Sequence, residues 1–160
     1  MSESEISADA VTIAELAARK GEDLGVSDWL TVDQDLINAF ADVSGDHQWI
    51  HVDTFRAAAH APSGTTIAHG FLLVALLSRF RAEAVPPFAD AAMGINYGFD
   101  RLRFVSPVKA GDRVRGRFVL DACSWLDRKT AQLTWNATIE LEMASKPALA
   151  ATWLTRAITH

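Results

Sequence analysis

Residues 68–84, AHGFLLVALLSRFRAEA, constrain the fold more than any other segment. Large apolar side chains from Phe71 to Leu77 fall on nearly every side of a helix, which predicts a helix buried on all faces. The run is too short to cross a bilayer, and Pro86 and Pro87 end it. The rest of the chain must therefore enclose this helix.

The second half of the chain has the period of strands. Apolar residues from Ala131 to Met143 alternate with polar residues from Thr130 to Glu142, which is typical of a long half-buried strand. Residues 114–122 and 149–158 alternate less regularly. Several long antiparallel strands after one buried helix predict an α+β domain whose sheet wraps around that helix.

Shorter elements are expected before the buried helix. Thr31 and Gln34 have the spacing of a capping box that opens a helix, and Gly45 would stop that helix. The full expectation is a strand over residues 25–30 and helices over residues 13–20, 31–43 and 54–59.

Composition sets the class of protein. The chain has 160 residues, of which 49% are hydrophobic and 22% charged, as expected for one soluble globular domain. We expect a flexible segment over residues 1–10 and a single domain over residues 11–160. The acidic, polar N-terminus is neither a secretory signal nor a transit peptide. Cys123 is the one cysteine, which fits a reducing cytoplasm.

The net charge of −5 argues against nucleic acid as a partner, and no apolar run predicts a membrane span. Positive charge is nevertheless concentrated between Arg101 and Arg117. This basic segment is either a solvated strand face or a local site for an anionic ligand such as a phosphate.

Residues 43–51, VSGDHQWIH, are the first candidate for chemistry. Asp46 and His51 have side chains suited to proton transfer near neutral pH. Trp49 and Ile50 between them would keep water out of a site. The alternative is a polar turn with a half-buried histidine.

A metal site is a third interpretation of this segment. His47 and His51 are four residues apart, and His60 and His69 follow. The segment is not expected to be helical, so this spacing does not place the two imidazoles on one helix face. Because no standard metal motif is present either, no metal is predicted.

Two further positions are candidates for a pocket. Gly70, after His69, lies at the expected start of the buried helix, where free N–H groups can stabilise an oxyanion. The alternative is a glycine needed for close packing of the helix on the sheet. Asn96 and Tyr97 follow the helix, and Tyr97 could direct its hydroxyl into a pocket or be a core aromatic residue.

Three stretches carry a family resemblance: GDHQWIHVD, APSGTTIAHGFLL and INYGFDRLRFVSPVKAGDRVRG. Together they resemble the MaoC-like dehydratases, which include the (R)-specific enoyl-CoA hydratases and the NodN-like proteins. The resemblance runs from about Ser27 to the C-terminus. The usual motif is Asp-x-Asn-Pro-x-His, and here Gln48 and Trp49 replace Asn and Pro, which is similar to the NodN-like branch.

The resemblance implies a hotdog fold, a homodimer and a role in fatty acid metabolism. It implies that Asp46 and His51 form the catalytic dyad, that the N–H of Gly70 binds the thioester oxygen, and that Ser78 lines the acyl pocket. The substrate would be an acyl-CoA or acyl-carrier-protein thioester, without a cofactor. In the hydration of a 2-enoyl thioester, Asp46 would be the base and His51 the acid.

Two other functions remain open from the sequence. A thioesterase on the same fold would direct water to the carbonyl carbon instead of C3. A non-catalytic acyl-thioester-binding module would not need the dyad, yet both dyad residues are present.

Overall fold

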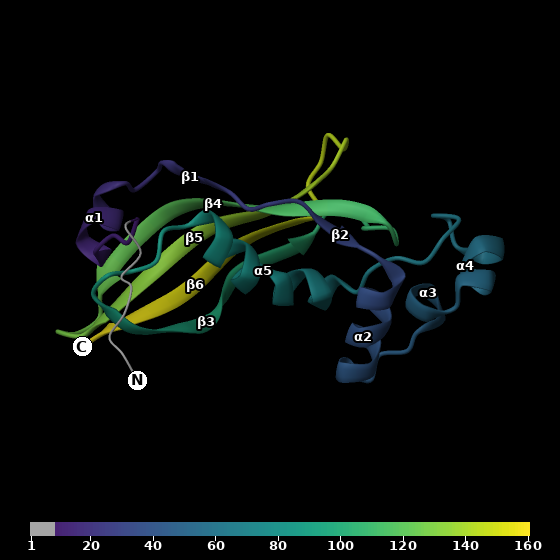
Figure 1. The fold of residues 1–160 in the computed structure, drawn as a ribbon, viewed down its shortest axis with the longest axis horizontal. Coiled ribbons are helices and arrows are strands. Elements are labelled where there is room, and N and C mark those ends of the chain that lie inside the picture. Colours follow the sequence, from purple (N-terminus) through teal and green to yellow (C-terminus); the bar gives the residue numbers. More distant parts are fainter. Residues whose placement is uncertain (1–8) are drawn as a thin grey trace.

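The computed structural model describes residues 9–160, so most of the segment expected to be flexible lies outside the described residues. One antiparallel sheet dominates the chain (Figure 1). Its long strands are β3 (Ala91–Phe104), β4 (Asp112–Trp125), β5 (Thr130–Leu141) and β6 (Leu149–Thr159), and its short ones are β1 (Asp23–Val26) and β2 (Leu30–Val32). The strand order is β1-β4-β5-β6-β3, with β2 also paired to β4.

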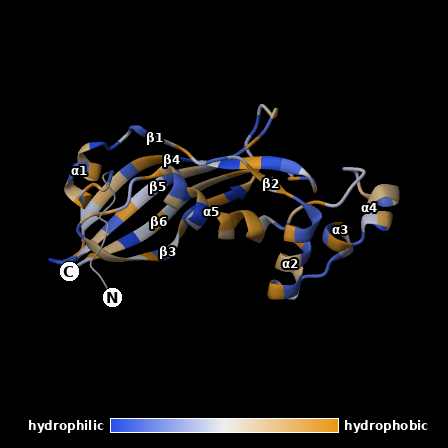
Figure 2. Ribbon diagram, in the orientation of Figure 1, coloured by the Kyte–Doolittle hydropathy of each residue, from blue (hydrophilic) through white to orange (hydrophobic). Residues whose placement is uncertain are grey.

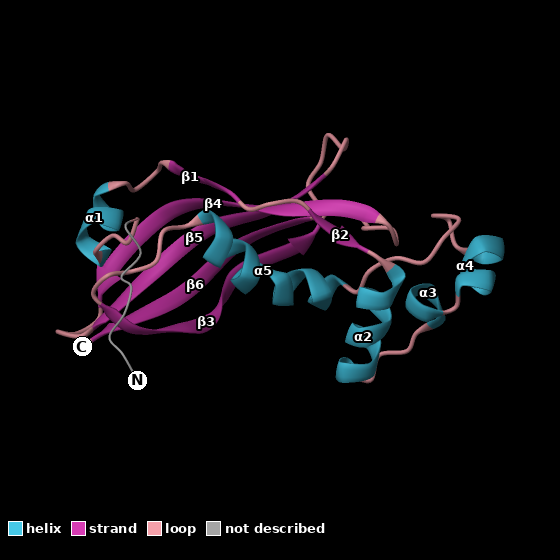
Figure 3. Cartoon of the chain, viewed as in Figure 1, coloured by secondary structure: helices cyan, strands magenta, loops and turns pink. Residues whose placement is uncertain are grey.

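Helix α5 (Gly70–Ala84) lies against one face of the curved sheet (Figure 3). Five of its side chains are buried there: Leu72, Leu73, Leu76, Leu77 and Phe80. Each such side chain contributes about 1.5–3 kcal/mol of transfer free energy. None of the helices within residues 9–160 is long and apolar enough to cross a membrane. The predicted α+β fold with a central helix is confirmed, but the prediction that this helix is buried on all faces is wrong: Phe71 is 70% exposed, because the sheet covers only one side of α5.

The alternation predicted for residues 130–143 is confirmed over most of its length. In β5 the side chains of Ala131, Leu133, Trp135, Ala137 and Ile139 are buried, and those between them are more exposed. The strand ends at Leu141, two residues earlier than the pattern suggests. Met143 adopts a positive φ of 60° and is fully exposed, so the chain has already turned there.

The predicted capping box at Thr31 is wrong. Thr31 is in β2 and pairs with Arg113 of β4. Helix α2 (Gln34–Ser44) is instead capped by Asp33, whose side chain accepts a hydrogen bond from the N–H of Leu36. A capping box does occur one helix earlier, where Thr12 and Glu15 open α1 (Ile13–Ala18).

The strand expected over residues 25–30 is also wrong, because β1 and β2 flank an interruption. The N–H of Ser27 donates to the carbonyl of Gly116, and the Ser27 hydroxyl accepts from the N–H of Gly116. The Ser27 hydroxyl therefore takes the place of a backbone carbonyl as the acceptor for the N–H of Gly116. Two short helices, α3 (Trp49–Val52) and α4 (Thr54–His60), follow α2, and all three gather beyond one end of the sheet (Figure 1).

Strand β3 forms one edge of the sheet. It pairs with β6 along one side, and its other side has no strand partner within residues 9–160. Five large apolar side chains of β3 are at least 36% exposed: Met93, Ile95, Tyr97, Phe99 and Phe104. A long unpaired edge with apolar side chains is a surface that natural proteins usually cover.

The close approach of α5 to β4 depends on Gly116. A Cβ at this position would lie 2.5 Å from the Cβ of Phe80 and 2.8 Å from a ring carbon of Phe118. We expect Gly116→Ala to lower the free energy of unfolding by about 1–3 kcal/mol, as overpacking does. Urea denaturation measures the effect. Gly94→Ala is the control, because nothing lies within 4 Å of an added Cβ there, and an equal loss in both variants would contradict the packing explanation.

Candidate active site

The turn after α2 places Asp46. Gly45 ends the helix in the left-handed region at φ 76°, and its N–H donates to the carbonyl of Ala41. The Asp46 carboxylate then accepts a hydrogen bond of 3.2 Å from the N–H of Gln48. This turn leads directly into α3, so the expectation that the whole segment is non-helical is wrong for residues 49–52.

His51 is buried, and one of its ring nitrogens already has a hydrogen-bond partner. Nδ1 lies 2.7 Å from the carbonyl oxygen of Ile67. A carbonyl only accepts, so Nδ1 carries the hydrogen and neutral His51 keeps a lone pair on Nε2. Burial lowers the pKa of His51. The imidazole therefore stays neutral at pH 7 and is ready to accept a proton at Nε2.

His69 links the Asp46 turn to the start of α5. Its ring stacks on that of His51 with 3.7 Å between centroids, and its Nε2 donates to the backbone carbonyl of Asp46 at 2.9 Å. Its Nδ1 is buried and has no hydrogen-bond partner within the described part of the chain. The sequence indicated His69 only as a possible pocket residue and gave no sign of this contact.

Gln34 also positions the site, and sequence reasoning missed it. Its side-chain amide donates to the carbonyl of His51 at 2.8 Å and accepts from the hydroxyl of Thr66. One side chain thus ties α2, α3 and the loop before α5 together. The polar residue at position 34 was visible, but partners 17 and 32 residues away leave no local pattern.

Asp46, His51 and His69 form one cluster. A carboxylate oxygen of Asp46 and a ring nitrogen of each histidine lie within 4.8 Å of one another. This spacing suits one water molecule that bridges the groups. One carboxylate and two imidazoles are also donors that suit a divalent ion such as Zn²⁺. His47, considered with His51 as a metal ligand, instead contacts Asp42 at 2.9 Å and lies outside the cluster.

Gly70 begins α5, and the helix has no side-chain cap, so first-turn N–H groups remain available to a ligand. Gly70 is one of the residues that line a pocket of about 330 Å³, together with His51 and Phe104. A Cβ on Gly70 would lie 2.8 Å from the ring of Phe104. Close packing of the helix on the sheet therefore accounts for the glycine, as the alternative interpretation of the sequence expects.

The other predicted site residues divide into two groups. Ser78 accepts a hydrogen bond of 3.1 Å from Asn96, and both line a second cavity farther along α5. Trp49 and Tyr97 do not line either of these cavities. Trp49 packs under Arg56, and Tyr97 lies exposed under Arg156.

The basic segment is largely neutralised. Arg113 pairs with Glu142, and Arg115 and Arg117 both pair with Glu140. For these residues the solvated strand face is the better interpretation. Arg101 and Arg103 have no ion pair among residues 9–160 and line a shallow pocket beside β6.

A long antiparallel sheet around one central helix defines this chain as a hotdog protein. The family model for the MaoC like domain matches residues 15–140. The chain belongs to this family, and the resemblance noted from the sequence is confirmed.

Three comparisons locate the chain within the family. Nodulation protein N of Rhizobium meliloti (strain 1021) is 49% identical over 144 residues, which cover 90% of this chain and 89% of the relative. The 3-hydroxyacyl-thioester dehydratase Z of Mycobacterium tuberculosis (strain ATCC 25618 / H37Rv) is 46% identical and covers 91% of this chain and 95% of its own. The R-hydratase PhaJ1 of Pseudomonas aeruginosa superposes with a TM-score of 0.66 at 25% identity, over 88% and 83% of the two chains.

We expect His51 and His47 to titrate on opposite sides of the ordinary histidine value of 6.5. Burial lowers the pKa of His51, whereas the hydrogen bond to Asp42 raises the pKa of His47. NMR titration of the ring protons measures both, with His51→Gln and His47→Gln to assign the signals. A midpoint for His51 above 6.5 would overturn the neutral imidazole described above.

Proposed function

We propose that the chain is a hydro-lyase that reversibly adds water to trans-2-enoyl thioesters and forms (R)-3-hydroxyacyl thioesters. One observation carries the proposal. A carboxylate and a neutral imidazole lie within 4.8 Å of each other, beside the uncapped start of the central helix. The similarity to a 3-hydroxyacyl-thioester dehydratase and to an R-hydratase supports the reaction and its stereochemistry.

Asp46 and His51 act on one water molecule. The carboxylate accepts one O–H of the water and orients it, while Nε2 of His51 takes the other proton as the oxygen bonds to C3. The π electrons of the C2–C3 bond move toward the carbonyl oxygen. His51 then returns the proton to C2, so the water is added without a net change in the protein.

This assignment reverses the roles expected from the sequence, where Asp46 was the base. It is supported by the hydrogen bond from Nδ1 of His51 to Ile67. Because that bond fixes the proton on Nδ1, the neutral ring has a lone pair and no proton to offer at Nε2. His51 becomes an acid only after it has taken the water's proton.

Gly70 would stabilise the charge that develops on the thioester oxygen. The backbone N–H of Gly70 is at the positive end of the α5 dipole. Fixed donors of this kind act where the charge appears and contribute about 2.7–4 kcal/mol to the transition state. No metal or redox cofactor is part of this proposed chemistry.

The acyl carrier is coenzyme A or an acyl-carrier protein. Arg101 and Arg103 lie on β3 near Phe104 and Val105, which line the pocket of His51 and Gly70. Neither guanidinium has an ion pair within the described range. We assign them to the phosphate groups of the carrier, because arginine matches phosphate geometry with paired hydrogen bonds.

The proposed active form is a homodimer that pairs through β3. The exposed side chains of Met93, Ile95 and Phe99 and the unpaired edge of this strand support it. Pairing two such edges would satisfy the free backbone groups and remove the apolar side chains from water.

We expect Asp46→Asn and His51→Gln each to lower kcat for hydration of crotonyl-CoA by at least about 10²-fold, as loss of a general acid–base group does. Loss of enoyl absorbance without release of free thiol identifies hydration. Release of thiol from a saturated acyl-CoA would identify a thioesterase, and tight binding with neither reaction would identify a binding module.

The controls separate acid–base chemistry from other causes. His47→Gln removes an exposed imidazole outside the cluster and should leave kcat unchanged.

Because the pKa of His51 is lowered, kcat/KM should fall only below pH 6.5, where Nε2 becomes protonated. Activity that is lost on dialysis against a chelator and restored by a divalent ion would make the cluster a metal centre instead.

We expect light scattering to give twice the chain mass of 17.4 kDa and Ile95→Lys to shift the protein toward the monomer. A lysine on the edge strand places a charge in the proposed interface. Val43→Lys is the control, since Val43 is 87% exposed at the end of α2. A monomeric wild-type protein would contradict the dimer.

A further inference from the structure

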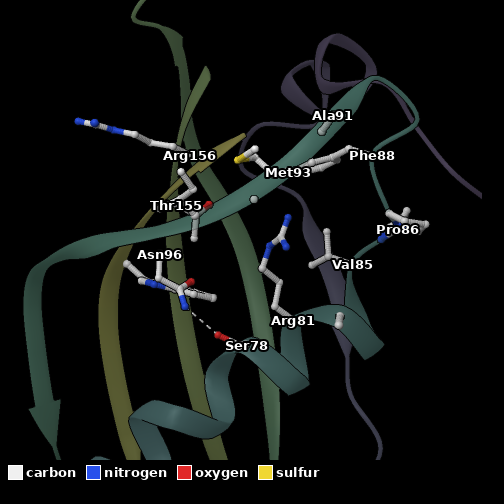
Figure 4. Close-up of a pocket in the computed structure, with 15 residues that line it drawn as sticks. Ser78, Arg81, Val85, Pro86, Phe88, Ala91, Met93, Asn96, Thr155 and Arg156 are labelled. Atoms are coloured by element: carbon white, nitrogen blue, oxygen red, sulfur yellow. Dashed lines mark hydrogen bonds between the residues drawn. The ribbon is translucent and has the colours of Figure 1, made fainter. Parts of the chain in front are cut away.

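A second cavity, of about 460 Å³, lies beside the C-terminal half of α5. Its walls come from α5, from residues 85–88 and from strands β3 and β6. Figure 4 shows the side chain of Arg81 extending from α5 into this space, between Val85 and Asn96. Figure 2 shows hydrophilic residues in this half of α5, whereas its first turns are hydrophobic.

Arg81 has no counter-charge of its own. It forms no ion pair within residues 9–160, and its Nε is buried without a hydrogen-bond partner. The rings of Phe88 and Trp135 lie 5.0 and 4.9 Å from the centre of its guanidinium. Aromatic faces offset part of the cost of burying a cation, but they do not satisfy its N–H groups.

The charge persists at neutral pH. Burial lowers the pKa of Arg81 to about 10, so the guanidinium remains protonated at pH 7. An unpaired buried cation is costly. An anion bound in the adjacent cavity would pair with this guanidinium and offset that cost.

Two hydroxyl groups of the cavity can also donate hydrogen bonds. The hydroxyl of Thr155 accepts from Nε1 of Trp135 at 2.8 Å, and that of Ser78 accepts from Asn96. Each hydroxyl hydrogen is therefore free to donate. None of the residues lining the cavity is acidic.

The cavity is in line with the proposed catalytic pocket. Gly70, Val74, Ser78 and Arg81 recur along one face of α5. The helical rise places Arg81 about 16 Å beyond Gly70. Apolar residues along this path, such as Val74 of α5 and Trp153 in the cavity wall, suit a hydrocarbon chain.

We propose that this cavity receives the far end of the acyl group and that Arg81 binds a carboxylate there, so that the protein selects acyl thioesters ending in a carboxylate. The inference rests on the proposed function, because it assumes that the thioester lies at Gly70. One guanidinium balances one carboxylate and offers it paired hydrogen bonds. The donor hydroxyls of Ser78 and Thr155 complete the site.

Calorimetry with saturated acyl-CoA thioesters tests this inference apart from catalysis, because these ligands cannot be hydrated. Pairs of equal chain length, one ending in a methyl group and one in a carboxylate, are compared over a range of lengths. At the best length the wild-type protein should bind the carboxylate form at least about 30-fold more tightly, as expected for hydrogen bonds to a charged group.

Arg81→Met should remove this preference, and Arg81→Lys should retain part of it. Arg79→Met is the matched control: Arg79 is on the same helix but pairs with Glu83 and should keep the preference. The melting temperature of each variant verifies that it folds. If Arg81→Met does not fold, the comparison of the two ligand series on the wild-type protein still tests the inference.

Equal affinity of the wild-type protein for both ligand series would overturn the inference, as would an equal loss for both in Arg81→Met. In that case the partner protomer or the aromatic rings alone would account for the buried cation. A separate hydration assay with the matching 2-enoyl thioesters tests the proposed function. Carboxylate-selective binding without hydration would sink that function and leave the Arg81 site intact.

Discussion

The packing of α5 against one face of the curved sheet is the constraint on which the rest of the structure depends. Leu73, Leu77 and Phe80 are buried against strands that are more than ten residues long, and Gly116 lets the helix approach closely. The start of the helix carries Gly70 and meets the Asp46 turn, while its second half carries Ser78 and Arg81 into a cavity.

The sequence predicted the parts of the fold that have a regular period. The apolar segment from Phe71 and the alternation from Ala131 specify a helix that packs on the sheet and a half-buried strand without knowledge of partners, although Phe71 itself is exposed. The errors occurred where a single side chain decides the local structure. Asp33 rather than Thr31 caps α2. The hydroxyl of Ser27 bonds to Gly116 where the expected strand is interrupted.

The sequence indicates which residues are candidates for the site but not the contacts that join them. Asp46, His51 and Gly70 followed from residue chemistry and family resemblance. The contacts that give them roles join residues far apart in sequence, such as Nδ1 of His51 with the carbonyl of Ile67 and His69 with the carbonyl of Asp46. The proposed direction of proton transfer rests on the first of these bonds, which no local sequence pattern indicates.

Among the described residues, two buried side-chain nitrogens lack a hydrogen-bond partner: Nδ1 of His69 and Nε of Arg81. Native proteins leave few such groups unsatisfied, because each one costs free energy. Both belong to the central helix or its cap, and they lie near opposite ends of it. The proposed ligand would supply both partners: an O–H of the reacting water or of the 3-hydroxyl group to the lone pair on Nδ1 of His69, and its terminal carboxylate to Arg81. The unsatisfied nitrogens thus support one binding site that follows the helix rather than two unrelated cavities.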